Sequence, residues 1–284
     1  MEITTRIGCS LNCRFCPQER LIKSYCKNSR DNMIMTLETY INCLDKIPQE
    51  VDIDFSGMCE PWLNENCTNM MKYAIERGHN VNVFTTLVGM TEEDYLFLRE
   101  SRLKTIVLHI PDEEGNSCFA MGEEYLRILN MALDDIIDGR LKIDAFSCHG
   151  KTDHRIVEKI EKTRVMVHRD MYDRAGNVND EDVQKVERIK KGNLVCTYCN
   201  GGTLSKNVLL PDGTVLMCCM DYGMEFVLGN LLEDDYEEIS TGEKKRLYQG
   251  MLKSQKSGNI LCRSCHVSEC KWKWLMEKAI RRIK

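Results

Sequence analysis

Six strand-like segments alternate with amphipathic segments through the first 170 residues of this 284-residue chain. When strands alternate with helices over short connections, each helix returns the chain to the start of the next strand, and the strands form a parallel sheet. The sequence therefore predicts an α/β fold whose sheet is open or curled into a partial (β/α)6 barrel of the TIM type. The predicted strands are residues 2–7, 51–55, 80–85, 104–110, 141–146 and 164–168, and the predicted helices are residues 36–46, 68–77, 91–100, 123–138 and 153–161.

The remaining residues predict a second, smaller unit. Residues 171–193 are polar and charge-rich. They predict a linker, which we assign to 176–192, with a short helix. Further on, Pro211-Asp212-Gly213 predicts a turn between two short strands, because this turn chemistry closes hairpins. We therefore expect a barrel domain at 1–175, a linker at 176–192, and a Cys-rich β-hairpin/helix module at 193–284. Within that module the predicted elements are strands at 207–210 and 214–219 and helices at 232–256 and 271–284.

Composition excludes several classes of protein. The formal net charge of −5 argues against nonspecific nucleic-acid binding. The longest apolar runs, residues 81–88 and 105–110, are strand-length, so we expect no membrane association. The first residues lack the apolar core of a signal peptide, which predicts a cytoplasmic location. In a reducing compartment, 16 cysteines indicate metal binding or thiol chemistry rather than structural disulfides.

Three cysteines stand close together directly after the first predicted strand: Cys9, Cys13 and Cys16, in a C-x3-C-x2-C pattern. Three thiolates on one tight loop bind three irons of a [4Fe–4S] cluster and leave the fourth iron without a protein ligand. An open position on a metal is where a small molecule binds. The alternatives are a zinc site that lacks one ligand, or a redox-active pair at Cys13 and Cys16. Both alternatives leave Cys9 unexplained.

This triplet, with Phe15 before its third cysteine, resembles the radical S-adenosylmethionine (SAM) enzymes. The resemblance implies a partial (β/α)6 barrel and an open iron that binds the amino and carboxylate groups of SAM. It also implies that one electron from the cluster cleaves SAM to methionine and a 5′-deoxyadenosyl radical, which abstracts a substrate hydrogen. Phe15 would lie near the adenine.

The same resemblance extends to the residues after the later strands. The Gly-Gly-Glu element of the family stands here as Ser56-Gly57-Met58-Cys59-Glu60, which departs from the two glycines. Glu60 would bind the methionyl amino group, with backbone contacts from Ser56 and Gly57. Thr85 and Thr86 are candidates for contacts with the ribose or methionine, or they are an ordinary Thr-rich strand end. Arg174 would pair with the SAM carboxylate or an anionic substrate group, or lie at the surface.

A second set of thiols lies in the carboxy-terminal module. Cys199, Gly213 and Cys218 match the C-x(9–15)-G-x4-C pattern of the SPASM and Twitch modules, which hold auxiliary clusters in radical SAM enzymes. With Cys262 and Cys265 they imply a second [4Fe–4S] cluster, and the ligands suffice for the one-cluster Twitch form. Cys196 or Cys270 could replace one of these ligands. Zinc is the competing metal, although zinc ribbons space their Cys pairs more closely.

Two further cysteines are candidate hydrogen donors to a substrate radical. Cys219 follows Cys218 directly, so on a strand the two would point to opposite faces. Cys148 ends the fifth predicted strand, where barrel enzymes place functional groups. For both residues, inert packing is the competing explanation.

The resemblance therefore implies an oxidoreductase with two [4Fe–4S] clusters and SAM. We expect it to dehydrogenate or epimerise a small carbohydrate or aminocyclitol-type substrate, with electrons from flavodoxin or ferredoxin. One alternative is an enzyme that modifies a ribosomally made peptide; we expect no recognition domain before Cys9, which argues against it. The alternative from another class is a non-catalytic binding protein that holds zinc or an iron–sulfur cluster. The oligomeric state is left open.

Overall fold

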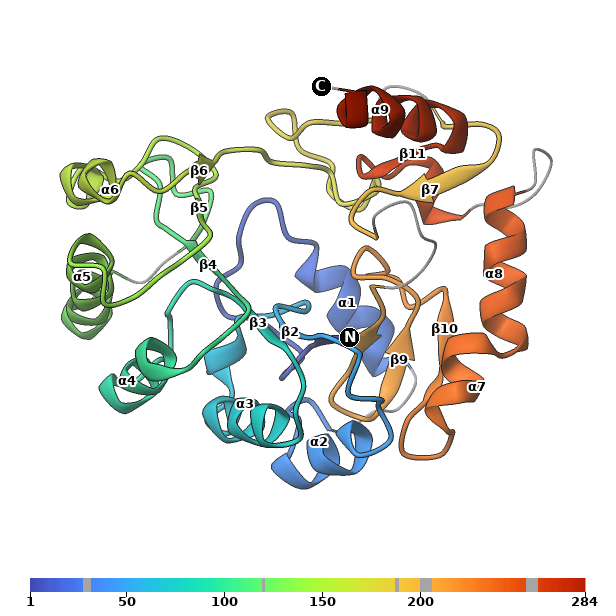
Figure 1. The fold of residues 1–284 in the computed structure, drawn as a ribbon, viewed down its shortest axis with the longest axis horizontal. Helices are drawn as coiled ribbons and strands as arrows, with labels where there is room; N and C mark the ends of the chain where they lie inside the picture. Colours follow the sequence, from blue (N-terminus) through green and yellow to red (C-terminus); the bar gives the residue numbers. More distant parts are fainter. Residues whose placement is uncertain (28–31, 119–120, 187–188, 200–205, 254–259, 284) are drawn as a thin grey trace.

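The computed structural model describes residues 1–27, 32–118, 121–186, 189–199, 206–253 and 260–283. Within these residues the main sheet is nine-stranded, in the order β10-β9-β8-β1-β2-β3-β4-β5-β6 (Figure 1). Its first six strands in chain order are mutually parallel where they pair, which confirms the predicted α/β fold. These strands are β1 (Glu2–Ile3), β2 (Ile53–Phe55), β3 (Val81–Thr85), β4 (Thr105–His109), β5 (Ala145–Ser147) and β6 (Val167–His168).

Helices cover one face of this parallel sheet, and in Figure 1 they form an arc around its outside. Thr36 accepts a hydrogen bond from the Thr39 amide, and Thr91 closes a capping box with Asp94, so both helices begin where the sequence predicts. Gly78 and Gly139 follow helices at φ +89° and +75°, a conformation that favours glycine. The helices are α2 (Leu37–Leu44), α3 (Cys67–Glu76), α4 (Glu92–Glu100), α5 (Glu123–Ile137) and α6 (Val157–Thr163).

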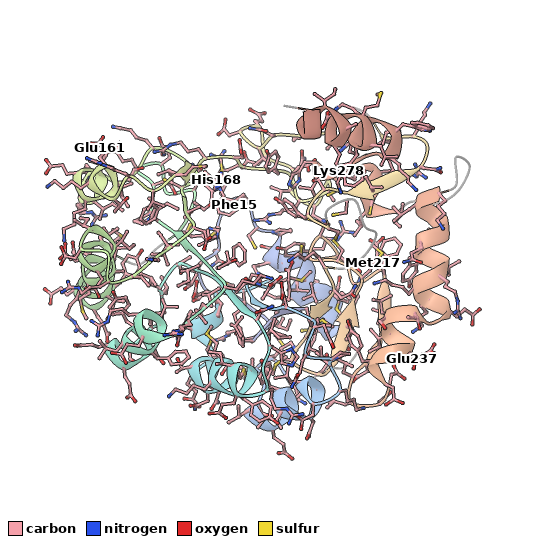
Figure 2. All side chains as sticks on the ribbon, viewed as in Figure 1. Phe15, Glu161, His168, Met217, Glu237 and Lys278 are labelled. Atoms are coloured by element: carbon pink, nitrogen blue, oxygen red, sulfur yellow. The ribbon has the colours of Figure 1, made fainter. Side chains whose placement is uncertain are left out.

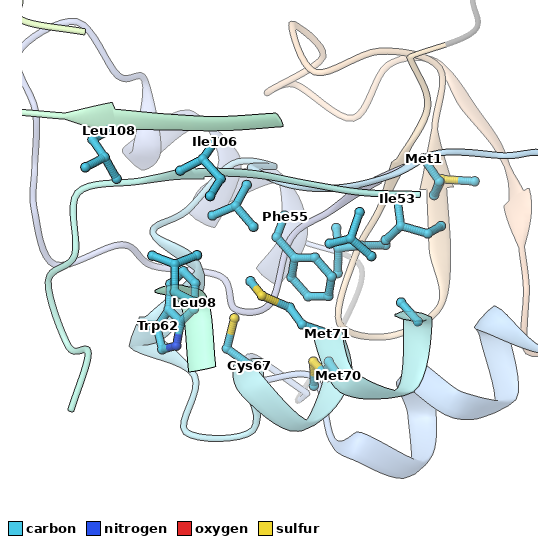
Figure 3. Close-up of a cluster of buried hydrophobic side chains, with 14 of the residues drawn as sticks. Met1, Ile53, Phe55, Trp62, Cys67, Met70, Met71, Leu98, Ile106 and Leu108 are labelled. Carbon is cyan, nitrogen blue, oxygen red and sulfur yellow. The ribbon is translucent and has the colours of Figure 1, made fainter. Parts of the chain in front are cut away.

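The main core lies between the sheet and these helices. Figure 3 shows Ile53, Phe55, Ile106 and Leu108 of the strands pointing toward Met71 and the other side chains of the helical layer. Since alternate residues of a strand point to opposite faces, the neighbours of these core residues face the inside of the curved sheet. We call that inner side the lumen. It carries the polar side chains of Glu2, Asp54 and Asn82, which stand side by side in the strand register.

One predicted strand is shorter than expected, and another begins later in the chain. Only Glu2–Ile3 of the segment 2–7 joins the sheet, because Arg6 bridges Ile34 and the Ile7 amide donates to Met33 instead. The fifth strand runs later than the predicted 141–146, since the Leu141 amide is still bonded to the Asp135 carbonyl at the end of α5. Helix α1 (Gln18–Cys26) and the short helix η1 (Pro61–Leu63) were not predicted.

The carboxy-terminal hairpin is an extension of the barrel sheet. Strand β8 (Val208–Leu209) pairs in parallel with β1, and β9 (Thr214–Leu216) and β10 (Val227–Asn230) continue the sheet in antiparallel fashion. Gly213 has φ +84° in the turn, as the Pro-Asp-Gly motif predicts. The module is therefore attached to the barrel edge through backbone hydrogen bonds.

The rest of the module forms a smaller layer. Strands β7 (Leu194–Cys196) and β11 (Ser268–Cys270) pair antiparallel, next to η2 (Leu261–Arg263) and α9 (Lys271–Ile283). The single helix predicted at 232–256 is wrong in the described residues, which form α7 (Tyr236–Thr241) and α8 (Glu243–Lys253). The predicted helix is interrupted at two places. The Asn230 side chain accepts from the Leu232 amide and forms a turn at 232–234. Gly242 separates α7 from α8, and a Cβ there would lie 2.1 Å from the Glu238 carbonyl oxygen. Residues 254–256 and 284 of the predicted helices lie outside the described residues.

The segment predicted as a linker with a short helix contains no helix in its described residues. Arg174 and Ala175 have φ +50° and +61°, which is incompatible with continuing a right-handed helix. Arg14 ties the segment down by pairing with Asp180 and Asp182. Among the described helices, none is both long enough and apolar enough to span a bilayer.

Candidate functional site

The three amino-terminal cysteines lie on the loop between β1 and α1. The Cys16 amide donates to the Cys13 carbonyl at 2.9 Å, which closes the loop around the thiols. Burial raises the pKa of the Cys13 thiol to about 12, and the neighbouring Cys16 and Cys9 act in the same direction. The three sulfurs are thus close enough to interact, and the loop keeps them together.

Gln18 holds this loop to the rest of the site. Its side chain is buried, accepts from the Cys9 amide at 3.4 Å, and donates toward the Cys16 sulfur at 3.5 Å and to the Met58 carbonyl. The sequence analysis missed Gln18. The only signal was its position two residues after the last cysteine, at the start of a helix that was itself not predicted.

The loop after β2 brings Glu60 beside the cysteines. The Glu60 amide donates toward the Cys9 sulfur. Its buried carboxylate accepts from the Thr85 hydroxyl at 2.6 Å and from the Thr86 amide and hydroxyl, both at 2.7 Å. Burial raises the pKa of Glu60, while these hydrogen bonds favour its charged form. The structure therefore brings Glu60, Thr85 and Thr86 together, with both threonines orienting the carboxylate.

Gly57 makes this arrangement possible. It has φ +45°, and a Cβ there would lie 2.5 Å from the Ile3 carbonyl oxygen and 2.6 Å from the Thr4 hydroxyl. The Met58 amide donates to that same hydroxyl at 3.0 Å. The backbone of residues 56–58 thus lies directly against β1, and Ser56 stands half-buried at its start.

Phe15 lies against His149 at the carboxyl ends of the strands, between the β4–β6 side and α1 (Figure 2). Its ring centroid is 3.9 Å from that of His149, which is 5.8 Å from that of His109. The His149 Nδ1 lies 2.9 Å from the Asp170 carbonyl oxygen, which requires the proton on Nδ1 and leaves Nε2 as an acceptor. Burial lowers the pKa of His149 to about 4, and the charge of Arg174 contributes to this shift.

Arg174 lies between the two groups of cysteines. Its guanidinium interacts electrostatically with Cys16 of the first group and Cys219 of the second, and with Tyr222. The Asn177 side chain bonds both the Arg174 carbonyl and the Met220 carbonyl, which fixes the left-handed turn on the module. No carboxylate of the described residues forms an ion pair with Arg174. A half-buried cation of this kind suits an anionic ligand.

The carboxy-terminal cysteines also gather at one place. Burial raises the pKa of the Cys262 thiol to about 12, with further contributions from Cys265 and Cys199. Cys218 interacts with Cys262 and Cys265. The four predicted auxiliary ligands thus share one neighbourhood. Cys196 also belongs to it, because its thiol is hydrogen-bonded to Cys199, whereas Cys270 is exposed.

Cys218 and Cys219 do not point to opposite faces of a strand. Strand β9 ends at Leu216, and the two thiols lie beyond it in a turn, where they are hydrogen-bonded to each other. The expectation was wrong because it extended the strand past its last ladder hydrogen bond. Cys219 also donates to the carboxylate of Glu2 in the lumen. Cys148, in contrast, is fully buried in the main core, and the structure does not bring it to the other site residues.

The donor sets fit iron–sulfur clusters. Among the described residues, no three His, Cys, Asp or Glu side chains converge as they would on a single metal ion. A cubane requires a wider arrangement, because each thiolate binds a different iron. One set supplies three interacting thiols on a loop with backbone and Gln18 donors to sulfur, and the other supplies at least four. Such donors stabilise the sulfurs of a bound cluster.

Comparison with known proteins agrees with this arrangement. Residues 199–266 match the model of SPASM, an iron–sulfur cluster-binding domain. That segment begins at Cys199 and includes Cys218, Cys262 and Cys265, whereas Cys196 and Cys270 lie outside it. No curated protein sequence matches the chain.

The fold is similar to that of solved proteins with bound AdoMet. A structure of BtrN in complex with AdoMet and 2-DOIA superposes with a TM-score of 0.60 at 16% identity, over 89% of this chain and 86% of BtrN. A structure of anSMEcpe with bound AdoMet has a TM-score of 0.51 at 14% identity, over 99% and 96% of the two chains. The chain therefore shares the fold of these AdoMet-bound proteins, a mostly parallel α/β sheet, and its residues 199–266 match an iron–sulfur cluster-binding domain.

Proposed function

We propose that the chain is a radical SAM oxidoreductase with one [4Fe–4S] cluster on Cys9, Cys13 and Cys16 and an auxiliary one on Cys199, Cys218, Cys262 and Cys265. The observation that carries the proposal is the pairing of β8 with β1. The pairing supports the proposal because Arg174 then interacts with Cys16 of the first group and with Cys219, the neighbour of the proposed auxiliary ligand Cys218. The domain limits 1–175, 176–192 and 193–284 belong to this proposal, as do the cytoplasmic location and a flavodoxin- or ferredoxin-type electron donor.

The residues of the first site have distinct roles in this proposal. When bound, the first cluster supplies the electron that cleaves SAM and so makes the 5′-deoxyadenosyl radical. Glu60, oriented by Thr85 and Thr86, binds the methionyl amino group, and the backbone at Ser56 and Gly57 lines the same side. The aromatic ring of Phe15 would pack against the adenine of bound SAM. Gln18 donates to the Cys16 sulfur and keeps the cysteine loop against residues 57–60.

We propose a polyol substrate of the carbohydrate or aminocyclitol type, which the enzyme dehydrogenates or epimerises. The lumen supports this class because the His149 Nε2 accepts from the Ser147 hydroxyl at 3.4 Å, and a substrate hydroxyl could replace Ser147 as the donor. Arg174 would bind an anionic group of the substrate or the SAM carboxylate. The similarity to BtrN, whose structure contains AdoMet and 2-DOIA, favours the same class.

A peptide substrate is the second candidate. Structures of anSMEcpe with bound peptides superpose over 99% of this chain, with a TM-score of 0.52 for the Kp18Cys complex. The two classes are separated by the contribution of His149, because we propose that a polyol hydroxyl binds beside its Nε2 in the lumen. His149→Leu would therefore weaken polyol binding more strongly.

Metal content and SAM cleavage test the proposal. Anaerobically reconstituted protein should hold about eight irons per chain, and the reduced protein should cleave SAM slowly without substrate. Cys16→Ala should abolish cleavage, whereas Cys26→Ala, at an exposed cysteine of α1, should leave it unchanged. About four irons together with zinc would assign zinc to the module. Zinc alone, or cleavage that survives in Cys16→Ala, would refute the enzyme.

Solvent deuterium distinguishes the two reactions. In epimerisation a thiol returns a hydrogen atom to the substrate radical, so deuterium enters the product. We propose Cys219 for this role, because its half-buried thiol is hydrogen-bonded to Glu2 and to the proposed auxiliary ligand Cys218. In oxidation the auxiliary cluster would supply an acceptor for one electron, the proton would pass to solvent, and no deuterium would be incorporated at carbon. Cys219→Ala should stop epimerisation but not SAM cleavage.

A further inference from the structure

The last helix exposes its apolar face. In α9 the exposed fractions are 75% for Trp272, 42% for Leu275, 58% for Met276 and 56% for Ile280. These positions recur at i, i+3, i+4 and i+8, so they line one side of the helix. A soluble helix normally turns such a stripe toward the core. The four large apolar side chains therefore form an uncovered stripe, which we call the α9 stripe.

The orientation of the helix is fixed by the strand that precedes it. Strand β11 runs directly into α9, and the Lys271 amide donates to the Asn193 carbonyl beside β7 at 2.9 Å. The half-buried side of the helix carries Trp274, Glu277 and Lys278, and the Lys278 ammonium lies 4.5 Å from the centre of the Trp274 ring. Figure 2 shows Lys278 on the side of α9 that faces β11. The side that carries Trp274 and the two charged residues thus packs inward, and the α9 stripe faces outward.

Charge indicates what covers the stripe. Residues 271–283 contain five Lys or Arg and one Glu, in a chain whose formal net charge is −5. At about 100° per residue, the exposed Lys271 and Lys273 border the stripe on its two sides. Lys273 also pairs with Glu269 and Glu277. A second copy of the helix would bring like charges together, whereas an anionic surface would meet complementary ones.

We propose that α9 binds the surface of membranes that contain anionic phospholipids. Apolar side chains with an aromatic residue on one face, and lysines at its borders, are the chemistry of helices that lie in the plane of the interface. The apolar side chains enter the acyl region, and the lysine stems extend along the helix so that their ammonium groups reach the lipid phosphates. This surface departs from the expectation of no membrane association, and it is independent of the proposed catalytic function.

Vesicle co-sedimentation of the cluster-loaded full chain tests the proposal. The chain should sediment with phosphatidylcholine vesicles containing phosphatidylglycerol, and binding should weaken as salt rises, because the attraction to anionic lipid is screened. Trp272→Ser combined with Ile280→Ser should weaken binding by at least about tenfold, because two of the four inserted side chains are lost. Leu247→Ser is the matched control: Leu247 is 60% exposed on α8, and its replacement should leave binding unchanged.

Three results would overturn the proposal. Failure to bind the anionic vesicles is the first, and a loss of binding in Leu247→Ser equal to that of the double variant is the second. The third is a dimer, seen by sedimentation velocity, that Ile280→Ser dissociates, which would assign the stripe to self-association. If the chain bound an acidic protein but not the anionic vesicles, that outcome would also overturn the proposal. Circular dichroism of the double variant confirms that α9 is intact before these comparisons are made.

Discussion

The hydroxyl of Tyr222 lies 3.9 Å from the sulfur of Cys16, although the two residues are 206 positions apart. Tyr222 is buried and belongs to the carboxy-terminal module, and Cys16 is the last cysteine of the amino-terminal loop. The contact exists because the hairpin pairs with β1. The module therefore shapes the surroundings of the amino-terminal cysteines as well as those of its own cysteines.

Tyr222→Phe should lower the reduction potential of the first cluster. Hydrogen bonds to cluster sulfurs help to set the potential, and loss of this donor makes reduction less favourable. The measurement is a redox titration followed by electron paramagnetic resonance. Tyr248→Phe is the control, since its hydroxyl donates to the Val227 carbonyl within the module. Equal potentials in all three proteins would show that Tyr222 has only a packing role.

Thr86→Val should weaken SAM binding. The change removes one of the two donors from Thr86 to the buried Glu60 carboxylate and keeps its amide. A hydrogen bond to a charged group contributes about 1.5–3 kcal/mol, which corresponds to a roughly 10- to 100-fold rise in Kd. Isothermal titration calorimetry with SAM measures this. The control is Thr163→Val on α6, where the Thr163 hydroxyl donates to the Ile160 carbonyl; this change should leave the Kd for SAM unaltered. If Thr86→Val also left the Kd unaltered, Glu60 would not be part of the SAM site.

Gly57→Ala should destabilise the fold more than Gly139→Ala. Both glycines have positive φ, which costs a non-glycine residue about 1–3 kcal/mol. Only at Gly57 would the new Cβ also strike backbone atoms, because nothing lies within 4 Å of a Cβ on Gly139. Urea unfolding of the two variants gives the comparison. An equal decrease in the free energy of unfolding of the two variants would mean that residues 56–58 do not pack against β1.

Glu2 should make stability fall as pH rises. Burial, with a contribution from Asp54, raises the pKa of Glu2 to about 7 from an ordinary value near 4.5. Between these values the folded state binds the proton that the unfolded state has lost, so the free energy of unfolding decreases with pH, by up to roughly 3 kcal/mol. The contribution is complete below pH 4.5 and absent above pH 7. Glu2→Gln should flatten this slope in urea unfolding measured across the range; an identical slope would contradict the assignment.

Arg174→Gln should raise the pKa of both lumen histidines. Burial lowers the pKa of His109 to about 3, and His149 and the Arg174 charge contribute as well. Arg174→Gln removes one of the causes of the low histidine pKa values, whereas burial remains. The pKa of His109 and that of His149 should therefore rise but stay below the usual 6.5. Imidazole NMR titration follows this. Arg155→Gln, at a side chain paired with Asp153, should leave both unchanged; a histidine pKa that does not respond to Arg174→Gln would place the guanidinium outside the lumen.

Local sequence determined the repeating elements and the thiol loop. Thr36, Thr91, Gly78 and Gly139 act through hydrogen bonds and backbone angles within a few residues, so their roles could be predicted without the fold. The spacing of Cys9, Cys13 and Cys16 is equally local. The end of β1 could not be predicted in this way, because Arg6 and Ile7 leave the sheet to pair with Ile34 and Met33, which are distant in sequence.

The relation between the two halves was decided only by tertiary structure. Pairing of β8 with β1 brings Tyr222 to Cys16 and Cys219 to Glu2, and no pattern within either segment contains that register. The same holds for Gln18, which matters because its side chain contacts two loops. It also holds for α9: the sequence shows the apolar periodicity of this helix, but its outward orientation depends on β11. Periodicity and spacing determine which residues share a face, whereas contacts between distant segments determine what that face meets.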